Sequence, residues 1–258
     1  MRKLFTLVSL LPVALLCGCA SSEKWGWYVI SPTTPRGRVN IEFLLSGVGW
    51  TIALTVCCVL LSILLGFLLY LPRISSNRWW HRLNRVLVEV LRSIPPLVSL
   101  LWVYYGLPVL TGWNLDPFVS GMIALSLYGG AFMAEIYRGG VQSIERGQFE
   151  AADSLALSTY DKMVYVVFPQ ALRRSLPAMG NQFVILLKMS SLVSVIGLTE
   201  VVRRANELSV TEYRPLEIYS FLVLEYLVLV LLLSAGVRWV ERRLGADEQD
   251  PQSRSMRE

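Results

Sequence analysis

The chain has 258 residues, of which 54% are hydrophobic and 17% charged, and its formal net charge is +5. A soluble globular domain averages roughly 45–50% apolar and about 25% charged residues, so this composition excludes an ordinary soluble domain and favours one polytopic membrane bundle. The positive charge does not indicate nucleic acid as a partner, because most basic residues flank apolar runs, as membrane topology requires.

The N-terminus combines a charged start with a short apolar run. Arg2 and Lys3 precede the apolar residues 4–16, and Cys17-Gly18-Cys19 follows. This order is typical of a secretory signal, and its end resembles a bacterial lipoprotein processing site, so we predict lipidation at Cys19. The alternative is an uncut sixth helix, although about 16 residues are short for a span. Either way, the chain emerges outside the cytoplasm.

Five apolar stretches approach the length of about 20 residues that a helix needs to cross a bilayer. They cover 43–71, 94–110, 118–137, 176–198 and 216–240. The chain shows no internal repeat, and an odd number of spans does not divide into two inverted halves. We therefore expect a second spanning subunit, either a copy of this chain or a different one.

The connections between these stretches differ in charge. Fifteen basic residues lie between the first and second stretches, between the third and fourth, and from the end of the fifth onward, whereas six lie on the other side. The positive-inside rule places the fifteen in the cytoplasm. We accordingly predict a signal or anchor segment at 1–19, a periplasmic extension at 20–42, a transmembrane domain at 43–243 and a cytoplasmic polar tail at 244–258.

Residues 77–92 alternate basic and apolar positions at helical spacing. We predict an amphipathic helix that lies in the cytoplasmic interface, anchored by Trp79, and leads into the second span. Its polar side carries Arg78, Arg82, Arg85, Glu89 and Arg92.

The connection between the third and fourth stretches predicts two short helices. Ala151 and Ala152 are strong helix formers whose small side chains let a partner approach the backbone. Ser158, followed by Asp161, resembles a capping box that starts the second helix, and Pro169 would end or kink it. A docking element and an ordinary connector fit this pattern equally well.

The run from Glu150-Ala151-Ala152 to Phe168-Pro169 resembles the EAA loop of bacterial ABC importer permeases. Ala156 stands where that pattern has a glycine, Phe168 stands at its leucine and Val166 at its isoleucine. If the glycine takes a left-handed conformation, alanine costs roughly 1–2 kcal/mol there. The turn then either adjusts or accepts the strain.

Further stretches resemble the polar amino acid uptake family of these permeases, of the histidine, glutamine and arginine type. The resemblance covers about 45–243 and implies an all-α, five-span type I ABC importer transmembrane domain with a cytoplasmic coupling-helix loop. The similar segments are 92–98, 105–108, 131–140, 169–183 and 186–198.

The resemblance also implies partners: two ATPase subunits, a second permease subunit, a periplasmic amino-acid-binding protein, membrane lipid of the bacterial inner membrane, and a polar amino acid as substrate. The chain lacks a Gly-x-x-x-x-Gly-Lys-Ser/Thr loop, so ATP and Mg belong to the partner ATPase and this chain is not itself an enzyme. We predict no cofactor on it. The expected ATPase-coupling residues are Arg146, Glu150, Ala151, Ala156, Pro169 and Ala152.

Lys188 lies inside the fourth span, where a charge costs about 2.5–3.5 kcal/mol and indicates a functional site by default. A substrate carboxylate is one counterion; Glu135 or Glu225 is the structural alternative, and snorkelling is another. In the family segment that Lys188 resembles, an Asp follows the Lys, and here Met189 replaces it. The expected substrate-pathway residues are Lys188, Met189, Ser190, Ser191 and Glu225.

Other polar residues favour structural roles. For Glu225 we favour pairing inside the bundle over substrate contact, and for Asn181 and Gln182 we predict hydrogen bonds between helices. His81 is the sole histidine, so we predict no metal site. Two alternatives to the ATP-driven permease remain: a secondary amino-acid transporter that works without ATP, and a structural membrane lipoprotein.

Overall fold

The computed structural model describes residues 25–73 and 77–244. Within these residues every regular element is helical, which confirms the predicted all-α fold. The predicted signal segment 1–19, the predicted lipidation site Cys19 and nearly all of the predicted tail lie outside the described residues.

The helices follow one another with short connections. The first are η1 (Trp27–Ile30), α2 (Pro35–Leu45), α3 (Val48–Tyr70), η2 (Leu71–Arg73) and α4 (Arg78–Ser93). Next come α5 (Pro96–Leu101), η3 (Trp102–Gly106), α6 (Leu107–Thr111), α7 (Pro117–Gln142), α8 (Arg146–Ser154) and α9 (Thr159–Asp161). The last are η4 (Lys162–Val167), α10 (Phe168–Met189), η5 (Ser190–Ile196), α11 (Val201–Glu212) and α12 (Pro215–Arg243).

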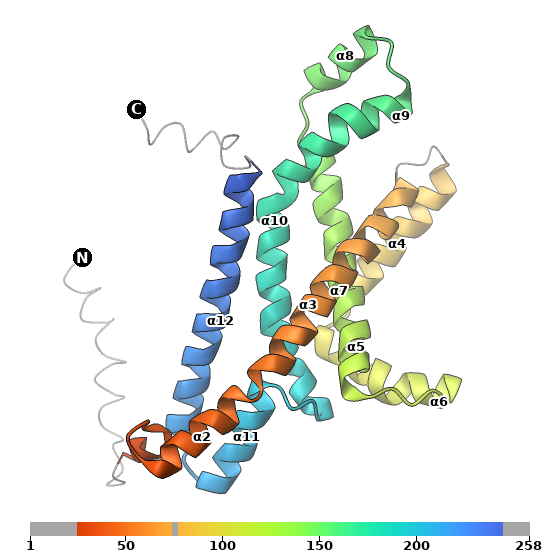
Figure 1. Cartoon of the computed structure of the whole chain (residues 1–258). Helices are drawn as coiled ribbons and strands as arrows, with labels where there is room; N and C mark the ends of the chain where they lie inside the picture. The colour runs from red at the N-terminus through yellow and green to blue at the C-terminus, as the bar shows by residue number, and fades with distance from the viewer. Residues whose placement is uncertain (1–24, 74–76, 245–258) are drawn as a thin grey trace, which may run out of the picture.

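The long helices run between two ends of the molecule, and each end carries a different set of short helices. Figure 1 shows α8 and α9 projecting at the top, whereas α2 and α11 lie across the bottom. Helices α10 and α12 run upright at the left, and α4, α5 and α6 lie on the right. We refer to the two ends as the α8 end and the α11 end.

Four helical stretches are long and apolar enough to cross a bilayer, and a bent pair of helices adds a fifth. The four are 35–73, 117–142, 159–196 and 215–243, and the pair joins α4 to Pro96–Thr111 at 96°. Ile94 and Pro95 are extended, with ψ of 126° and 133°, because the residue before a proline avoids the helical region. The predicted amphipathic helix is therefore α4, set off from the second span.

The second and fourth spans each contain a π-helical turn directly before a proline. Turn η3 precedes Pro108, and η4 precedes Pro169. At the end of η4 the Phe168 amide bonds to the Met163 carbonyl, five residues back, so the ladder changes register where proline has no N–H to donate. Of the two outcomes predicted for Pro169, an end of the helix is not found, because the helical chain continues into α10.

Small residues bring the spans close together. A Cβ added to Gly66 on α3 would lie 2.3 Å from the Met133 Cβ of α7. One added to Gly140 on α7 would lie 1.9 Å from the Ser175 Oγ of α10. Helices in lipid associate through such close backbone approach, and α3, α7 and α10 form the centre of the bundle.

Candidate functional site

The loop of residues 146–167 at the α8 end contains the two predicted short helices. Helix α8 is followed by a turn, and α9 begins at the predicted cap: the Ser158 Oγ accepts a hydrogen bond from the Asp161 amide at 3.1 Å. The Ser158 hydroxyl also donates to the Asp161 carboxylate at 2.6 Å. Each bond spans three residues, so the local sequence is sufficient to start this helix.

The turn after α8 places Ala156 in the left-handed region, with φ of 52°. The Leu157 amide donates to the Ala152 carbonyl at 3.2 Å, and the Ala156 amide donates to the Asp153 carbonyl at 2.9 Å. This pair of bonds is the Schellman motif, in which glycine is usual at the left-handed position. Of the two outcomes left open by the sequence, the turn accepts the strain of roughly 1–2 kcal/mol.

The inner face of the loop packs against α7 and α10. Ile144, Val167 and Ala171 form a small buried core, to which Phe149 and Met163 add partial cover. Ala152 is 2% exposed. The Ala152 side chain therefore faces inward, and the place of Ala152 among the coupling residues stays a prediction.

The outer face of the loop is exposed and carries most of the predicted coupling residues. Arg146, Glu150, Ala151, Ala156 and Pro169 are all exposed. Three large apolar or aromatic side chains accompany them, and the sequence reasoning missed these: Leu155, Tyr160 and Tyr165, exposed by 74%, 73% and 72%. Spacing gave no clear signal for them, because Leu155 lies three residues after the buried Ala152 and Tyr160 lies seven before the buried Val167.

Polar contacts brace the loop against its own base. Lys162 forms an ion pair with Asp153 at 2.5 Å, and Gln170 donates to Gln148 at 3.0 Å. Each contact joins α8 to η4 or α10. The loop is thus held in one position while its outer face stays open to a partner.

The charged residue inside the fourth span has no counterion within residues 25–73 and 77–244. Lys188 is exposed on α10, and none of the ion pairs among the described residues includes it. Glu135 instead pairs with Arg73 at 2.6 Å and with Arg138 at 2.8 Å. The structural pairing considered for Lys188 is therefore wrong.

A buried polar cluster lies where η5, α11 and α12 meet. Ser190 is fully buried, and the Tyr226 hydroxyl donates to the Glu200 carboxylate at 3.4 Å. Glu225 is 7% exposed, and neither of its carboxylate oxygens has a hydrogen-bond partner among the described residues. The pairing predicted for Glu225 is therefore also wrong. Glu200 and Tyr226 belong to this cluster, and the sequence reasoning missed both.

Glu200 lies in the connection between the fourth and fifth spans and caps α11. It is fully buried, and its carboxylate accepts a hydrogen bond from the Arg203 amide at 2.8 Å. Burial raises the pKa of this carboxyl to about 7, against the lowering effect of hydrogen bonds from the Val202 and Arg203 amides and from Tyr226. Sequence offered one signal, a glutamate before an amphipathic helix, which is weak by itself.

Two other interior predictions also fail. Gln182 is buried, but its amide nitrogen has no hydrogen-bond partner within the described part of the chain. Asn181 is exposed.

Met189 packs beside the largest apolar core, and Ser191 bonds to the Lys188 carbonyl at 2.8 Å. The predicted pathway residues therefore separate into an exposed lysine and a buried cluster.

Several membrane-spanning helices and a braced loop that projects from one end define a multi-pass membrane component. Residues 59–246 match the family described as binding-protein-dependent transport system inner membrane component. The chain belongs to this family, and the predicted resemblance to ABC importer permeases is confirmed.

Curated relatives and solved structures agree with this assignment. The chain is 34% identical to the glutamine transport system permease protein GlnP of Escherichia coli strain K12 over 86% of this chain and 98% of that protein. It is 36% identical to the arginine transport system permease protein ArtQ of Bacillus subtilis strain 168 over 84% of this chain and 98% of that protein.

Among solved structures, the fold resembles an amino acid ABC transporter crystallised with histidines. The TM-score is 0.74 and the identity 36%, over 79% of this chain and 94% of that one. The MetNI methionine ABC transporter shares the fold, with a TM-score of 0.68 at 22% identity over 79% and 97% of the two chains.

Proposed function

We propose that this chain lets a polar amino acid cross the bacterial inner membrane, driven by a separate ATPase that docks on the outer face of residues 146–167. The observation that carries this proposal is the loop itself, in which Glu150 is exposed while Ala152 and Phe149 attach the helix to the bundle. A braced loop of this kind transmits movement of a docked subunit to α10, because η4 continues directly into that helix.

The α8 end faces the cytoplasm in this proposal, and the α11 end faces the periplasm. The distribution of basic residues supports this orientation, since α4 and the loop of residues 146–167 carry many of them. Residues 20–42 are then periplasmic and the C-terminus cytoplasmic. A periplasmic binding protein delivers the substrate at the α11 end.

The substrate passes beside the exposed face of α10 that carries Lys188. This lysine has no carboxylate counterion among the described residues, so a substrate α-carboxylate can fill that role. A second permease subunit completes the pathway, and the spanning part of α12 supports this because most of it is uncovered, with 6% buried. Glutamine and arginine, the substrates in the names of the relatives, set the class of compound to test first.

Co-purification tests the docking surface. The full chain is expressed with the ATPase encoded beside it, solubilised in detergent and captured, as wild type and as Glu150→Lys. Glu42→Lys is the matched control, because Glu42 is also an exposed helical glutamate but lies on α2 at the α11 end. We expect ATPase recovery with wild type and with Glu42→Lys, and loss of most recovery with Glu150→Lys.

Two other outcomes redirect the proposal. Equal recovery with all three forms moves the contact away from Glu150. Recovery with none, from a folded and monodisperse preparation, counts against an ATP-driven permease and favours the secondary transporter. Uptake of labelled glutamine or arginine into proteoliposomes, with and without the ATPase, separates these last two functions directly.

A further inference from the structure

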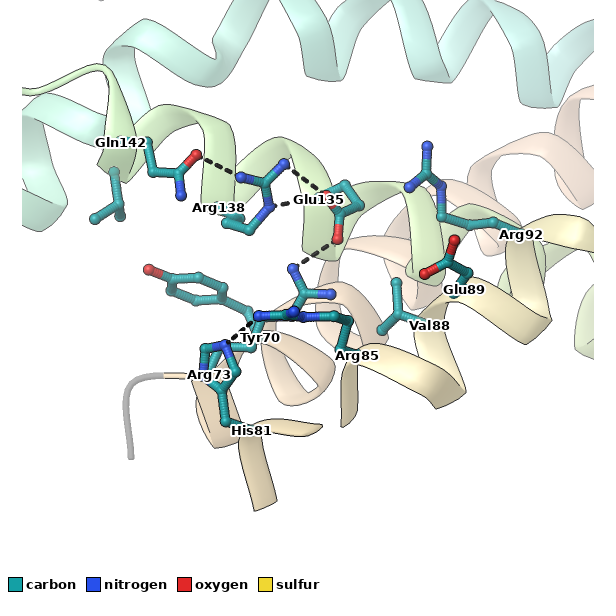
Figure 2. Close-up of a pocket in the computed structure, with 11 residues that line it drawn as sticks. Tyr70, Arg73, His81, Arg85, Val88, Glu89, Arg92, Glu135, Arg138 and Gln142 are labelled. Carbon is teal, nitrogen blue, oxygen red and sulfur yellow. Dashed lines mark hydrogen bonds and ion pairs between the residues drawn. The ribbon is translucent and has the colours of Figure 1, made fainter. Parts of the chain in front are cut away.

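A cavity of about 500 Å³ opens between the ends of α3 and α7 and the polar face of α4. Figure 2 shows the arginine side chains that line it, which come from η2, α4 and α7. No residue of α10 or α12 lines it, so it is separate from both Lys188 and the buried cluster around Glu225. Neither the coupling loop nor the proposed substrate path accounts for this cavity.

Two of its arginines share one carboxylate. The Arg73 side chain is 6% exposed and pairs with Glu135 at 2.6 Å, and Arg138 pairs with the same carboxylate at 2.8 Å. Arg73 also donates to the Asn84 side chain of α4 at 3.0 Å. These contacts fix the wall of the cavity and use the full charge of Glu135.

The other two arginines, Arg85 and Arg92, have no carboxylate within ion-pair distance among the described residues. Arg85 contacts the His81 ring at 3.2 Å, and Arg92 lies over the Phe132 ring at 4.7 Å. Glu89 lines the cavity too but makes no ion pair there. Four arginines and two carboxylates line the cavity, so its net charge is positive.

The opposite face of α4 is apolar and uncovered. Trp79, Val86 and Val90 are exposed on it, and a second hollow of about 290 Å³ is lined by Trp79, Trp80 and Leu83 together with Asn77. A helix with one basic and one apolar face lies at the membrane surface, with its charges among the lipid headgroups. The cavity then sits at headgroup depth, in the leaflet whose anionic lipids attract basic groups.

We propose that Arg85 and Arg92 bind a phosphate group in this cavity, and that an anionic phospholipid such as phosphatidylglycerol supplies it. Guanidinium groups bind phosphate oxygens through paired, charge-assisted hydrogen bonds. The uncovered apolar face of α4 favours a lipid over soluble phosphate, because it gives the acyl chains a surface beside the headgroup. The proposal uses the membrane orientation given above, but neither the ATPase nor the transported amino acid.

Native mass spectrometry of the full chain in detergent tests it, with phosphatidylglycerol and phosphatidylcholine as probes. The variant is Arg85→Gln/Arg92→Gln. The control is Arg78→Gln/Arg82→Gln, which removes equal charge from the same helix outside the cavity. We expect phosphatidylglycerol to bind wild type more tightly than phosphatidylcholine, with about a tenfold loss in the variant and less than about a twofold loss in the control.

Competition identifies the source of the phosphate. Inorganic phosphate is added at constant ionic strength, with chloride as the reference. If it fails to displace phosphatidylglycerol, the lipid headgroup is the ligand. If it binds in an Arg85- and Arg92-dependent manner, soluble phosphate fills the same site. Equal binding of the two lipids, or equal loss in the variant and the control, overturns the proposal.

Thermal unfolding of each variant checks that the comparison is valid. If the double variant does not fold, Arg85→Gln and Arg92→Gln are each compared with Arg82→Gln by the same measure. Because no ATPase or amino acid is present, a failure here leaves the transport proposal untouched, and a failure of ATPase co-purification leaves this one untouched.

Discussion

The loop of residues 146–167 and the cluster of Glu200, Glu225 and Tyr226 are built in opposite ways. The second helix of the loop begins with a local contact, the cap of Ser158 on Asp161, and the loop presents an exposed face. The cluster joins groups that are distant in the sequence, and it is buried. A region held by local contacts is readable from sequence, whereas a region held by distant contacts is not.

The two regions also differ in the free-energy cost of their polar groups. Polar groups of the loop are exposed or paired, so the loop can carry charge without penalty. Glu225 is buried with both carboxylate oxygens unpaired in the described structure, a condition that costs free energy unless the group is neutral or finds a partner. The cluster is therefore the part of the bundle whose stability depends most on protonation or on a ligand.

Ala152→Arg should produce the largest change, because it places a charge where the side chain is 2% exposed. We expect α8 to detach from η4, with a loss of about 4 kcal/mol in the local free energy of opening. Hydrogen exchange of residues 146–167 measures it. Val210→Arg, at an exposed position of α11, is the control. Unchanged protection of the loop in Ala152→Arg would contradict the inward packing.

Glu200 predicts a pH dependence of stability. Its carboxyl has a pKa of about 7 in the folded chain against an ordinary value of 4.5, so the folded state binds the proton more tightly than the unfolded state does. This stabilisation, on the order of 3 kcal/mol at most, is complete below pH 4.5 and disappears as the pH rises through 7.

Thermal unfolding in detergent at pH 4.5, 6 and 8 measures this effect. Glu200→Gln keeps a capping oxygen but cannot titrate, so its unfolding temperature should fall less across the range than that of wild type. Glu42→Gln, at an exposed position, is the control. Parallel profiles for wild type and Glu200→Gln would show that another group titrates.

Ala156→Gly should stabilise the loop modestly. Ala156 has φ of 52°, which glycine adopts without strain, although glycine also gains freedom in the unfolded chain. The two effects together leave a gain of about 1 kcal/mol in the opening free energy of the loop. Hydrogen exchange of residues 146–158 reports it, and Ala156→Val, which is β-branched, should act in the opposite direction. A loss of protection with glycine would refute the strain argument.

Lys188→Gln should change stability least. Because Lys188 is exposed and makes no ion pair in the described part of the chain, its replacement should alter the free energy of unfolding by less than about 0.5 kcal/mol. In the proposed pathway it should nevertheless raise the KM for amino-acid uptake several-fold. A large loss of stability with unchanged uptake would instead assign Lys188 a structural role, for example at the contact with the second permease subunit.

The features that sequence spacing did not determine share one cause. Pro169 does not end its helix because a π-helical turn absorbs the missing donor, and sequence spacing does not reveal a change in the hydrogen-bond ladder. Ala152 turns inward while the neighbouring Ala151 is exposed, and two identical side chains in sequence do not reveal which of them faces the bundle. Lys188 and Glu225 stay apart because the rotation of α10 and α12 about their own axes depends on packing across the bundle.

Composition and local spacing were sufficient to predict the membrane class, the number and approximate position of the apolar stretches, the amphipathic α4, the capped loop and the family. Each of these depends on composition or on residues within a few positions of one another. Which face of α8 is free, which buried carboxylates meet, and which arginines share a cavity became clear from the folded chain alone. These depend on how helices far apart in sequence rotate and pack, because a side chain's neighbours across a bundle are set by close packing between helices rather than by spacing along one of them.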